Sequence, residues 1–288
     1  MTDLISAVLN PSIPFLRNAL LVGFFSSAAF GVIGSFIVVR KISYIAGAIS
    51  HSVLAGIGLS LYCRYHFGWT WFDPLMGAFG AGLVSALIIG SVRGAVKERE
   101  DTIIGAIWAV GMALGLLFIA RTPGYVDPMS YLFGNILIVS GADLVRVLIL
   151  DAVVITVALL FFSKLQAAGF DEEFTAVRGI SPRFYYFLLL ILTAVTVVLM
   201  TTIVGIVMVI ALLTLPAAVS NLFVKRLIPM IYLTGLLTMV FTVSGISLSF
   251  VTDLPSGPVI IVLAGAVYLA VFLARILIRR IRRTARQE

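Results

Sequence analysis

Charged residues are scarce in this sequence. Only 11% of its 288 residues are Asp, Glu, Lys or Arg, whereas the average for soluble domains is about 25%. Apolar residues make up 61% of the chain, and the mean hydropathy is +1.16. Charge this sparse cannot cover the surface of a soluble globule. The composition therefore predicts an integral membrane protein, all-α and polytopic, embedded in a lipid bilayer.

Three further absences narrow the function. Cys63 is the single cysteine, so no internal disulfide can form and no cysteine-based metal site is expected. The G-x-x-x-x-G-K-[ST] phosphate loop is absent, which excludes a nucleotide-driven motor of that type within the chain. No cleavable signal is evident, because the N-terminus carries Asp3 and lacks a basic region. The net charge of +7 does not indicate a nucleic-acid partner, since Lys and Arg lie mainly in loops and at the C-terminal end.

Long apolar runs dominate what is present. Each is close to the roughly 20 residues that a helix needs to cross a bilayer. We count nine: 19–39, 42–62, 75–92, 102–120, 144–162, 184–201, 203–223, 228–250 and 258–278. Eight spans are possible if one lies at the surface, or if a single broken helix replaces the pair that meets at Thr201–Thr202. The apolar segment within 122–143 is too short to cross and is predicted to be re-entrant or interfacial. One membrane domain, 1–288, accounts for the chain.

Basic residues predict the orientation. Suppose that four loops and the tail face the cytoplasm: 40–41, 93–101, 164–183, 225–226 and 275–288. That side then holds 16 of the 20 Lys and Arg. Cytoplasmic loops carry such an excess of positive charge. The N-terminus is therefore predicted outside, and the basic tail in the cytoplasm.

Two ionisable groups lie at membrane depth, His51 and Asp151. Such groups are costly there unless they face protein or a water-filled cavity. Neutral imidazole is a common ligand of divalent transition metals, so His51 and the adjacent Ser50 are candidates to line a metal path. The alternative is a packed histidine that bonds a backbone carbonyl. At helical spacing the His51 face also carries Gly47, Ala48, Ala55 and Gly58, so nearly everything around the imidazole is small. Small residues allow another helix to approach closely or leave room for an ion.

Asp151 and Pro216 carry weaker signals. Asp151 has apolar helical neighbours throughout, and it faces either the conduction path or a structural or subunit contact. Pro216 interrupts the backbone hydrogen bonding of an apolar run. Such breaks often line transport paths, and a plain kink is the alternative.

The cytoplasmic loop 164–183 predicts a docking element. Its acidic cluster, Asp171, Glu172 and Glu173, suits a helix N-terminus, and Gly179 suits the helix end. A short amphipathic helix between two spans fits a groove on a soluble partner.

Several stretches, in order, resemble the permease subunits of ATP-binding-cassette importers for manganese, zinc and iron. The resemblance covers roughly residues 15–272. SYIAGAISHSVLAGIG, at 43–58, is similar to the Gly-Asp-Ala-x-Ser-His-x-x-Leu-x-Gly helix of that family. FDEEFTAVRGI, at 170–180, is similar to its coupling loop. Four other stretches resemble further family signatures: REDTIIG, SYLFGNILIVSGADL, VGIVMVIALLTLPAAVS and LPSGPVIIVL.

The resemblance implies a complex in a bacterial inner membrane. Its parts would be a dimer of this chain or a pair with a sibling permease, two cytoplasmic ATP-binding subunits, and an extracytoplasmic metal-binding protein. No permanently bound cofactor is implied, since Mn, Zn or Fe would be the substrate. It also implies that His51 lies on the metal path. The ATPase-coupling residues would be Phe170, Asp171, Glu172, Glu173, Phe174, Arg178 and Gly179.

One departure from the family affects the site. Gly47 stands where the family usually has an acid, and Ala55 stands at its common proline. The usual carboxylate partner of His51 is therefore missing, and Asp151 could substitute for it.

Three functions are considered for this sequence. The favoured one is a permease without catalysis of its own, coupled to ATPases through the loop at 170–180. The alternative is an ion-coupled secondary metal transporter, with Asp151 and His51 as a proton relay. An intramembrane enzyme built on Ser50 and His51 is disfavoured, because adjacent residues of a helix do not face each other.

Overall fold

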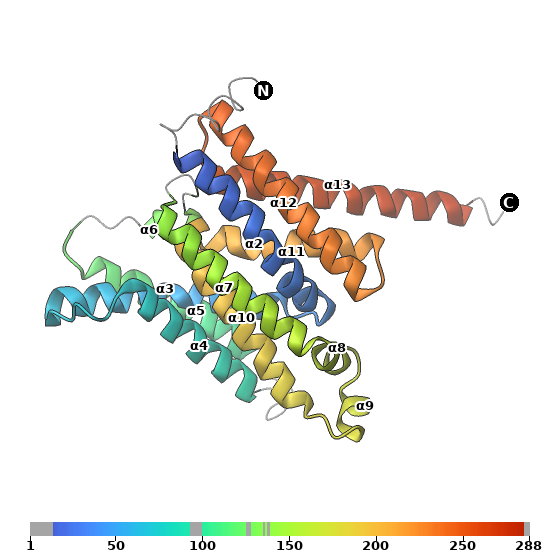
Figure 1. Ribbon diagram of the computed structural model, residues 1–288, viewed down its shortest axis with the longest axis horizontal. Helices are drawn as coiled ribbons and strands as arrows, with labels where there is room; N and C mark the ends of the chain where they lie inside the picture. Colours follow the sequence, from blue (N-terminus) through green and yellow to red (C-terminus); the bar gives the residue numbers. More distant parts are fainter. Residues whose placement is uncertain (1–13, 93–99, 125–127, 135, 137–138, 285–288) are drawn as a thin grey trace.

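The computed structural model describes residues 14–92, 100–124, 128–134, 136 and 139–284. Within these ranges the regular structure is helical, with no strand, which confirms the predicted all-α class (Figure 1). The helices are α2 (Pro14–Val39), α3 (Ser43–Phe67), α4 (Pro74–Val92), α5 (Glu100–Ala120), α6 (Pro128–Phe133), α7 (Gly141–Leu160), α8 (Phe162–Phe170), α9 (Glu172–Val177), α10 (Pro182–Val204), α11 (Ile206–Phe223), α12 (Leu227–Thr252) and α13 (Ser256–Thr284).

The predicted number of spans is confirmed. Eight helices in the described part are long and apolar enough to cross a membrane. A ninth span results if α7 and α8, which meet at an angle of 68°, are taken together. The predicted fifth span, 144–162, lies in α7 and the start of α8. Parts of the charged loop 93–101 and of the tail 275–288 lie outside the described residues.

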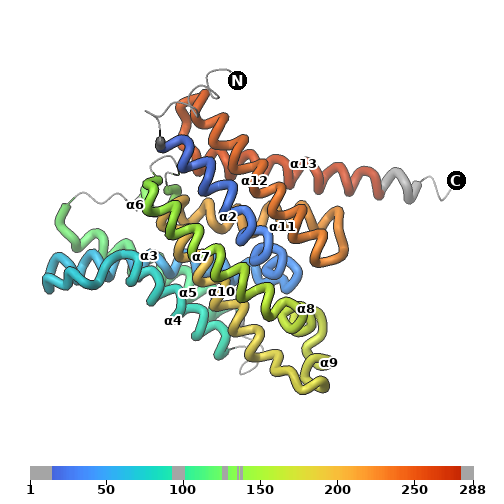
Figure 2. Tube along the Cα trace, viewed as in Figure 1, coloured from blue at the N-terminus to red at the C-terminus, as the bar shows by residue number. Residues whose placement is uncertain are grey.

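The helices differ in how much of their surface other helices cover. The spans of α2, α3 and α10 are each more than 70% buried, whereas that of α13 is only 11% buried. Figure 2 shows α13 leaving the bundle at a wide angle to α12. Because lipid is as apolar as a protein core, exposed apolar helices such as α13 are stable in a bilayer.

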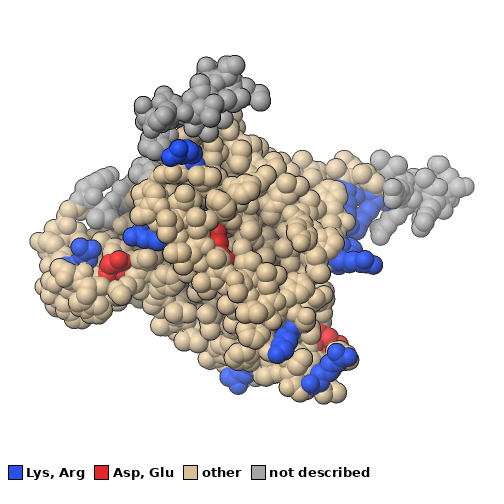
Figure 3. Space-filling view, in the orientation of Figure 1, with Lys and Arg blue, Asp and Glu red and all other residues tan. Residues whose placement is uncertain are grey.

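The surface matches that arrangement. Figure 3 shows a broad face with few charged residues, while many of the Lys and Arg gather towards α8, α9 and the far end of α13. An uncharged belt between charged ends is what a bilayer requires of its solutes.

Small residues of α3 allow neighbouring helices to pack closely against it. Helix α3 packs most extensively against α5 and α4. It crosses α4 at Gly56 and Gly77, where a Cβ on either residue would overlap the backbone carbonyl of the other. It meets α5 at Gly58, where a Cβ would lie 2.5 Å from the carbonyl oxygen of Gly115. Of the two uses that small residues allow, the structure shows close helix approach at these positions.

The boundary between α10 and α11 differs from the prediction. The chain turns at Gly205, not at Thr201–Thr202. The two threonine hydroxyls instead donate to carbonyls one turn earlier, to Val197 and Leu199, within a continuous helix. Gly205 has φ +88°, and a Cβ there would overlap the backbone of Gly134, so only glycine fits. The two helices are therefore separate spans.

Gly134 belongs to the segment predicted as re-entrant or interfacial. In its described part this segment forms the single short helix α6, which is not a span and packs on α10 and α11. Residues 125–127, 135, 137 and 138 of the segment lie outside the described ones. The close contact with Gly205 holds α6 against the turn between two spans.

Candidate metal path and coupling segment

His51 lies in the buried middle of α3 and stacks on Trp108 of α5. The ring centroids are 4.6 Å apart and the planes are inclined by 21°. The His51 side chain is buried, and its Nδ1 makes no hydrogen bond to any residue that the structure describes. The alternative role, a histidine that bonds a backbone carbonyl through this nitrogen, is therefore not seen. A buried nitrogen of this kind calls for an explanation such as an ion or a water.

Trp108 occupies the space that the missing family acid would need. A Cβ added to Gly47 would lie 2.5 Å from Cζ3 of the Trp108 indole. Tyr44, one turn earlier on α3, also contacts the indole, with centroids 5.5 Å apart. The indole thus covers the helix surface next to His51, and it leaves no room at position 47 for the side chain of the usual acid. No periodic pattern in the sequence indicates this contact, and its one signal is a single tryptophan inside an apolar span.

Ser50 is fully buried, and its hydroxyl donates to the carbonyl of Ala46, 2.8 Å away. Its proton is thereby used within α3, and only lone pairs remain for a passing ion. Ser52 on the same helix bonds across to α4, where the Ser85 hydroxyl donates to it over 2.7 Å. The serine pair is a packing contact between α3 and α4.

Asp151 and His51 lie on helices that have different main packing partners within one chain. Helix α7 packs mainly against α2 and α10, whereas α3 packs mainly against α4 and α5. Asp151 is buried, and its Oδ2 makes no hydrogen bond within the described residues. The described residues also contain no group of three or more His, Cys, Asp and Glu that could hold a metal ion. The helix packing thus gives no support to the replacement of the missing acid by Asp151 within one chain.

Pro216 lies inside α11 and is buried. One turn later, the Ser220 hydroxyl donates to the Pro216 carbonyl over 2.9 Å. On the neighbouring side, a Cβ on Gly34 of α2 would lie 2.5 Å from the carbonyl oxygen of Leu213. The helix near the proline is thus tightly covered by α2.

The short helix predicted within the loop 164–183 is present as α9. Asp171 caps α9, since its carboxylate accepts from the Phe174 N–H over 2.9 Å. Gly179 ends the helix with φ +74°, and its N–H donates to the carbonyl of Ala176 over 2.9 Å. The segment exposes three apolar side chains, Phe170, Phe174 and Val177.

The two glutamates of α9 differ. Glu172 forms an ion pair with Arg40 of the same chain, 2.8 Å away. Glu173 is exposed and forms no ion pair with a described residue. Of the two, only Glu173 therefore presents a carboxylate that is not engaged by Arg40.

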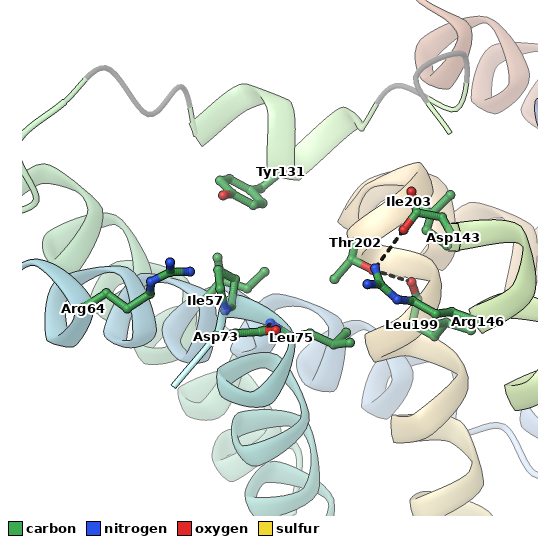
Figure 4. Close-up of a pocket in the computed structure, with 11 residues that line it drawn as sticks. Ile57, Arg64, Asp73, Leu75, Tyr131, Asp143, Arg146, Leu199, Thr202 and Ile203 are labelled. Carbon is green, nitrogen blue, oxygen red and sulfur yellow. Dashed lines mark hydrogen bonds and ion pairs between the residues drawn. The ribbon is translucent and has the colours of Figure 1, made fainter. Parts of the chain in front are cut away.

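A pocket of about 280 Å³ opens on the side predicted to be extracytoplasmic (Figure 4). Figure 4 shows Arg64 and Asp73 on one side of it, Asp143 and Arg146 on the other, and Tyr131 of α6 above. Arg146 pairs with Asp143 at 2.9 Å, and Asp143 also completes the capping box of α7. Asp73 accepts from two backbone N–H groups at the start of α4. Both carboxylates are thus used as helix caps. The pocket was missed at the sequence level because five separate elements line it.

Comparisons with known proteins agree over almost the whole chain. The family model of the ABC 3 transport family matches residues 12–275. A "probable metal transport system membrane protein" of Chlamydia trachomatis is 39% identical over 88% of this chain and 87% of the relative. The manganese transport system membrane protein MntC of Listeria monocytogenes is 35% identical over 90% of each chain. The structure of PsaBC from Streptococcus pneumoniae in complex with Fab superimposes with a TM-score of 0.82 at 30% identity, covering 94% of this chain and 95% of that one.

Proposed function

The chain belongs to the ABC 3 transport family, and from this premise we propose that it is the permease of an ATP-driven manganese importer. Family membership makes the chain the membrane component of a transporter and not an enzyme, with the ATPase on a separate subunit. The substrate is a divalent metal ion. Manganese is favoured over zinc and iron because MntC, similar over the whole length, is a manganese transport protein by name.

The observation that carries the metal path is His51. Its imidazole lies at the middle of the most enclosed span, with a buried Nδ1 that makes no hydrogen bond to a described residue. Manganese accepts imidazole together with oxygen ligands. In the described residues of one chain His51 belongs to no group of three or more His, Cys, Asp and Glu that could hold a metal ion. The remaining ligands would be water, a backbone or serine oxygen such as that of Ser50, or groups of a second permease. In this arrangement Gly47 and Pro216 shape the path without binding the ion.

Each end of the helix bundle presents a surface for a different partner protein. ATP-binding subunits dock on α9 and its exposed apolar residues, on the side where 16 of the 20 Lys and Arg gather by sequence. This side is the cytoplasm, and it includes the C-terminal tail. An extracytoplasmic metal-binding protein delivers the ion at the pocket beside Arg64 and Tyr131. A second permease, either another copy or a sibling, completes the pathway in the cell inner membrane.

The test is uptake of radioactive manganese by cells that carry the complete transporter. We expect uptake to stop when ATP is depleted and to persist when an ionophore collapses the proton gradient. The reverse pattern would indicate an ion-coupled secondary transporter and would overturn the proposal. That alternative needs a relay between His51 and Asp151, whose helices have their main packing partners elsewhere.

A further inference from the structure

Arg40 has a buried side chain at the cytoplasmic end of the first span. It directly follows Val39, the last residue of α2, and two residues separate it from Ser43, the first residue of α3. Its side chain is only 4% exposed, and its guanidinium pairs with Glu172 of α9 at 2.8 Å. The same group donates to the carbonyl of Ala168 in α8 and lies over the ring of Tyr186 in α10, 5.2 Å from the centroid. One side chain thus contacts all three helices around the coupling segment.

The chemistry of this contact suits arginine and no other residue. A planar guanidinium can donate to several acceptors in its plane and stack on an aromatic ring at the same time. A buried charge is costly unless it is paired and hydrogen-bonded, and here the carboxylate and the carbonyl meet that need. Lysine would keep the charge but could not bond two acceptors and stack in the same geometry.

The turn that holds Arg40 is short and well defined. The Arg40 N–H donates to the carbonyl of Phe36 over 3.0 Å, and the Ile42 N–H donates to that of Ile37 over 3.0 Å. Helix α3 then begins at Ser43 and runs without a break past His51 to Phe67. A displacement of Arg40 is therefore passed to the first turn of the helix that carries His51, eight residues before the histidine.

Helix α9 packs on α8 and α10, and α10 in turn packs on α3. This packing through α10 is one route from α9 to the His51 helix, and the ion pair is a second. The Arg40–Glu172 ion pair joins α9 directly to the α2–α3 turn. It therefore bridges the segment that docks on the ATP-binding subunits and the segment that carries the candidate metal ligand.

We propose that Arg40 is the positioning residue that transmits movement of α9 to the His51 helix. This inference rests on the proposed function. When the ATP-binding subunits move α9, the ion pair draws the α2–α3 turn with it and shifts α3 relative to α4 and α5. Without Arg40, ATP would still be hydrolysed, but less of it would result in transport.

The experiment measures manganese taken up per ATP hydrolysed, with the permease, its ATP-binding subunits and its metal-binding protein reconstituted in proteoliposomes. The variants are Arg40→Gln, Arg40→Lys and Glu172→Gln. The matched control is Lys41→Gln, next to Arg40 in the turn. Assembly of each variant is checked by co-purification of the ATP-binding subunits.

We expect Arg40→Gln to keep its ATP-binding subunits and to lower uptake per ATP about tenfold, within the usual range of coupling between two sites. Glu172→Gln should cause a smaller loss in the same direction, Arg40→Lys should fall between wild type and Arg40→Gln, and the Lys41→Gln control should match wild type. Adding Glu172→Gln to Arg40→Gln should cause no further loss, because Arg40→Gln has already removed the ion pair.

Two results would overturn the inference. The first is wild-type uptake per ATP in both Arg40→Gln and Glu172→Gln. The second is an Arg40→Gln permease that fails to assemble while Glu172→Gln, at an exposed position, transports normally, which would make Arg40 purely structural. Failure of the proposed function is distinct, since the wild-type vesicles themselves would then show no ATP-dependent uptake.

Discussion

Adding a single methyl group at Gly47 tests whether the Trp108 indole fills the space beside His51. In Gly47→Ala the new Cβ would lie 2.5 Å from Cζ3, 3.0 Å from Cη2 and 3.4 Å from Cε3 of the indole. Ordinary carbon contacts are about 3.5–4.0 Å. The indole cannot simply move aside, because its ring lies against both Tyr44 and His51.

The cost can be worked from two opposing terms. Overpacking of this kind costs about 1–3 kcal/mol. Replacing glycine by alanine inside a helix returns up to about 1 kcal/mol. With the full gain of about 1 kcal/mol, the net expectation is a destabilisation of about 0–2 kcal/mol relative to wild type. When the indole is removed, in Trp108→Ala, the first term vanishes, so Gly47→Ala should then be neutral or stabilising by up to about 1 kcal/mol.

The assay is a double-mutant cycle in detergent micelles. Loss of helical circular dichroism on titration with SDS gives the free energy of unfolding of wild type, both single variants and the double variant. Gly80→Ala is the matched control, because a Cβ at Gly80 of α4 meets nothing within 4 Å. Equal effects of Gly47→Ala with and without Trp108 would refute the reasoning, and so would a Gly47→Ala protein as stable as the Gly80→Ala control.

Two other positions give sharp expectations. Gly205→Ala combines a positive φ of +88° with overlap of the Gly134 backbone. It should therefore lower the free energy of unfolding by about 3 kcal/mol or more, which a fall in the thermal midpoint would report. An unchanged midpoint would contradict the described turn. Phe174→Asp changes an exposed residue of α9, so the permease should still insert but should lose at least about tenfold in affinity for the ATP-binding subunits, as measured by co-purification at graded subunit concentrations. Full retention of the subunits would place the docking surface elsewhere.

The sequence was sufficient for features that depend on local chemistry. Apolar run length gave the spans, and cap chemistry gave both ends of α9 at Asp171 and Gly179. Such signals depend on residues within one turn of each other. The turn between α10 and α11 was placed a few residues early, because threonines can bond back into a membrane helix and do not end it.

The sequence was not sufficient for contacts between helices. Lipid-facing and protein-facing sides are both apolar in these spans, so periodicity cannot indicate which helices meet. The stacking of Trp108 on His51 and the pairing of Arg40 with Glu172 join residues 57 and 132 positions apart. Whether Asp151 substitutes for the missing acid could not be predicted for the same reason. Helix α7, which carries Asp151, packs mainly on α2 and α10.

We propose that this permease imports a divalent metal along a path that includes His51. The most direct test is the metal content of cells that lack the gene, grown in chelated medium and measured by elemental analysis. We predict that manganese falls, that the wild-type gene restores it, and that His51→Ala, inserted to the same level, does not. No change in any metal would contradict the importer, whereas full rescue by His51→Ala would leave the importer standing and remove His51 from its path.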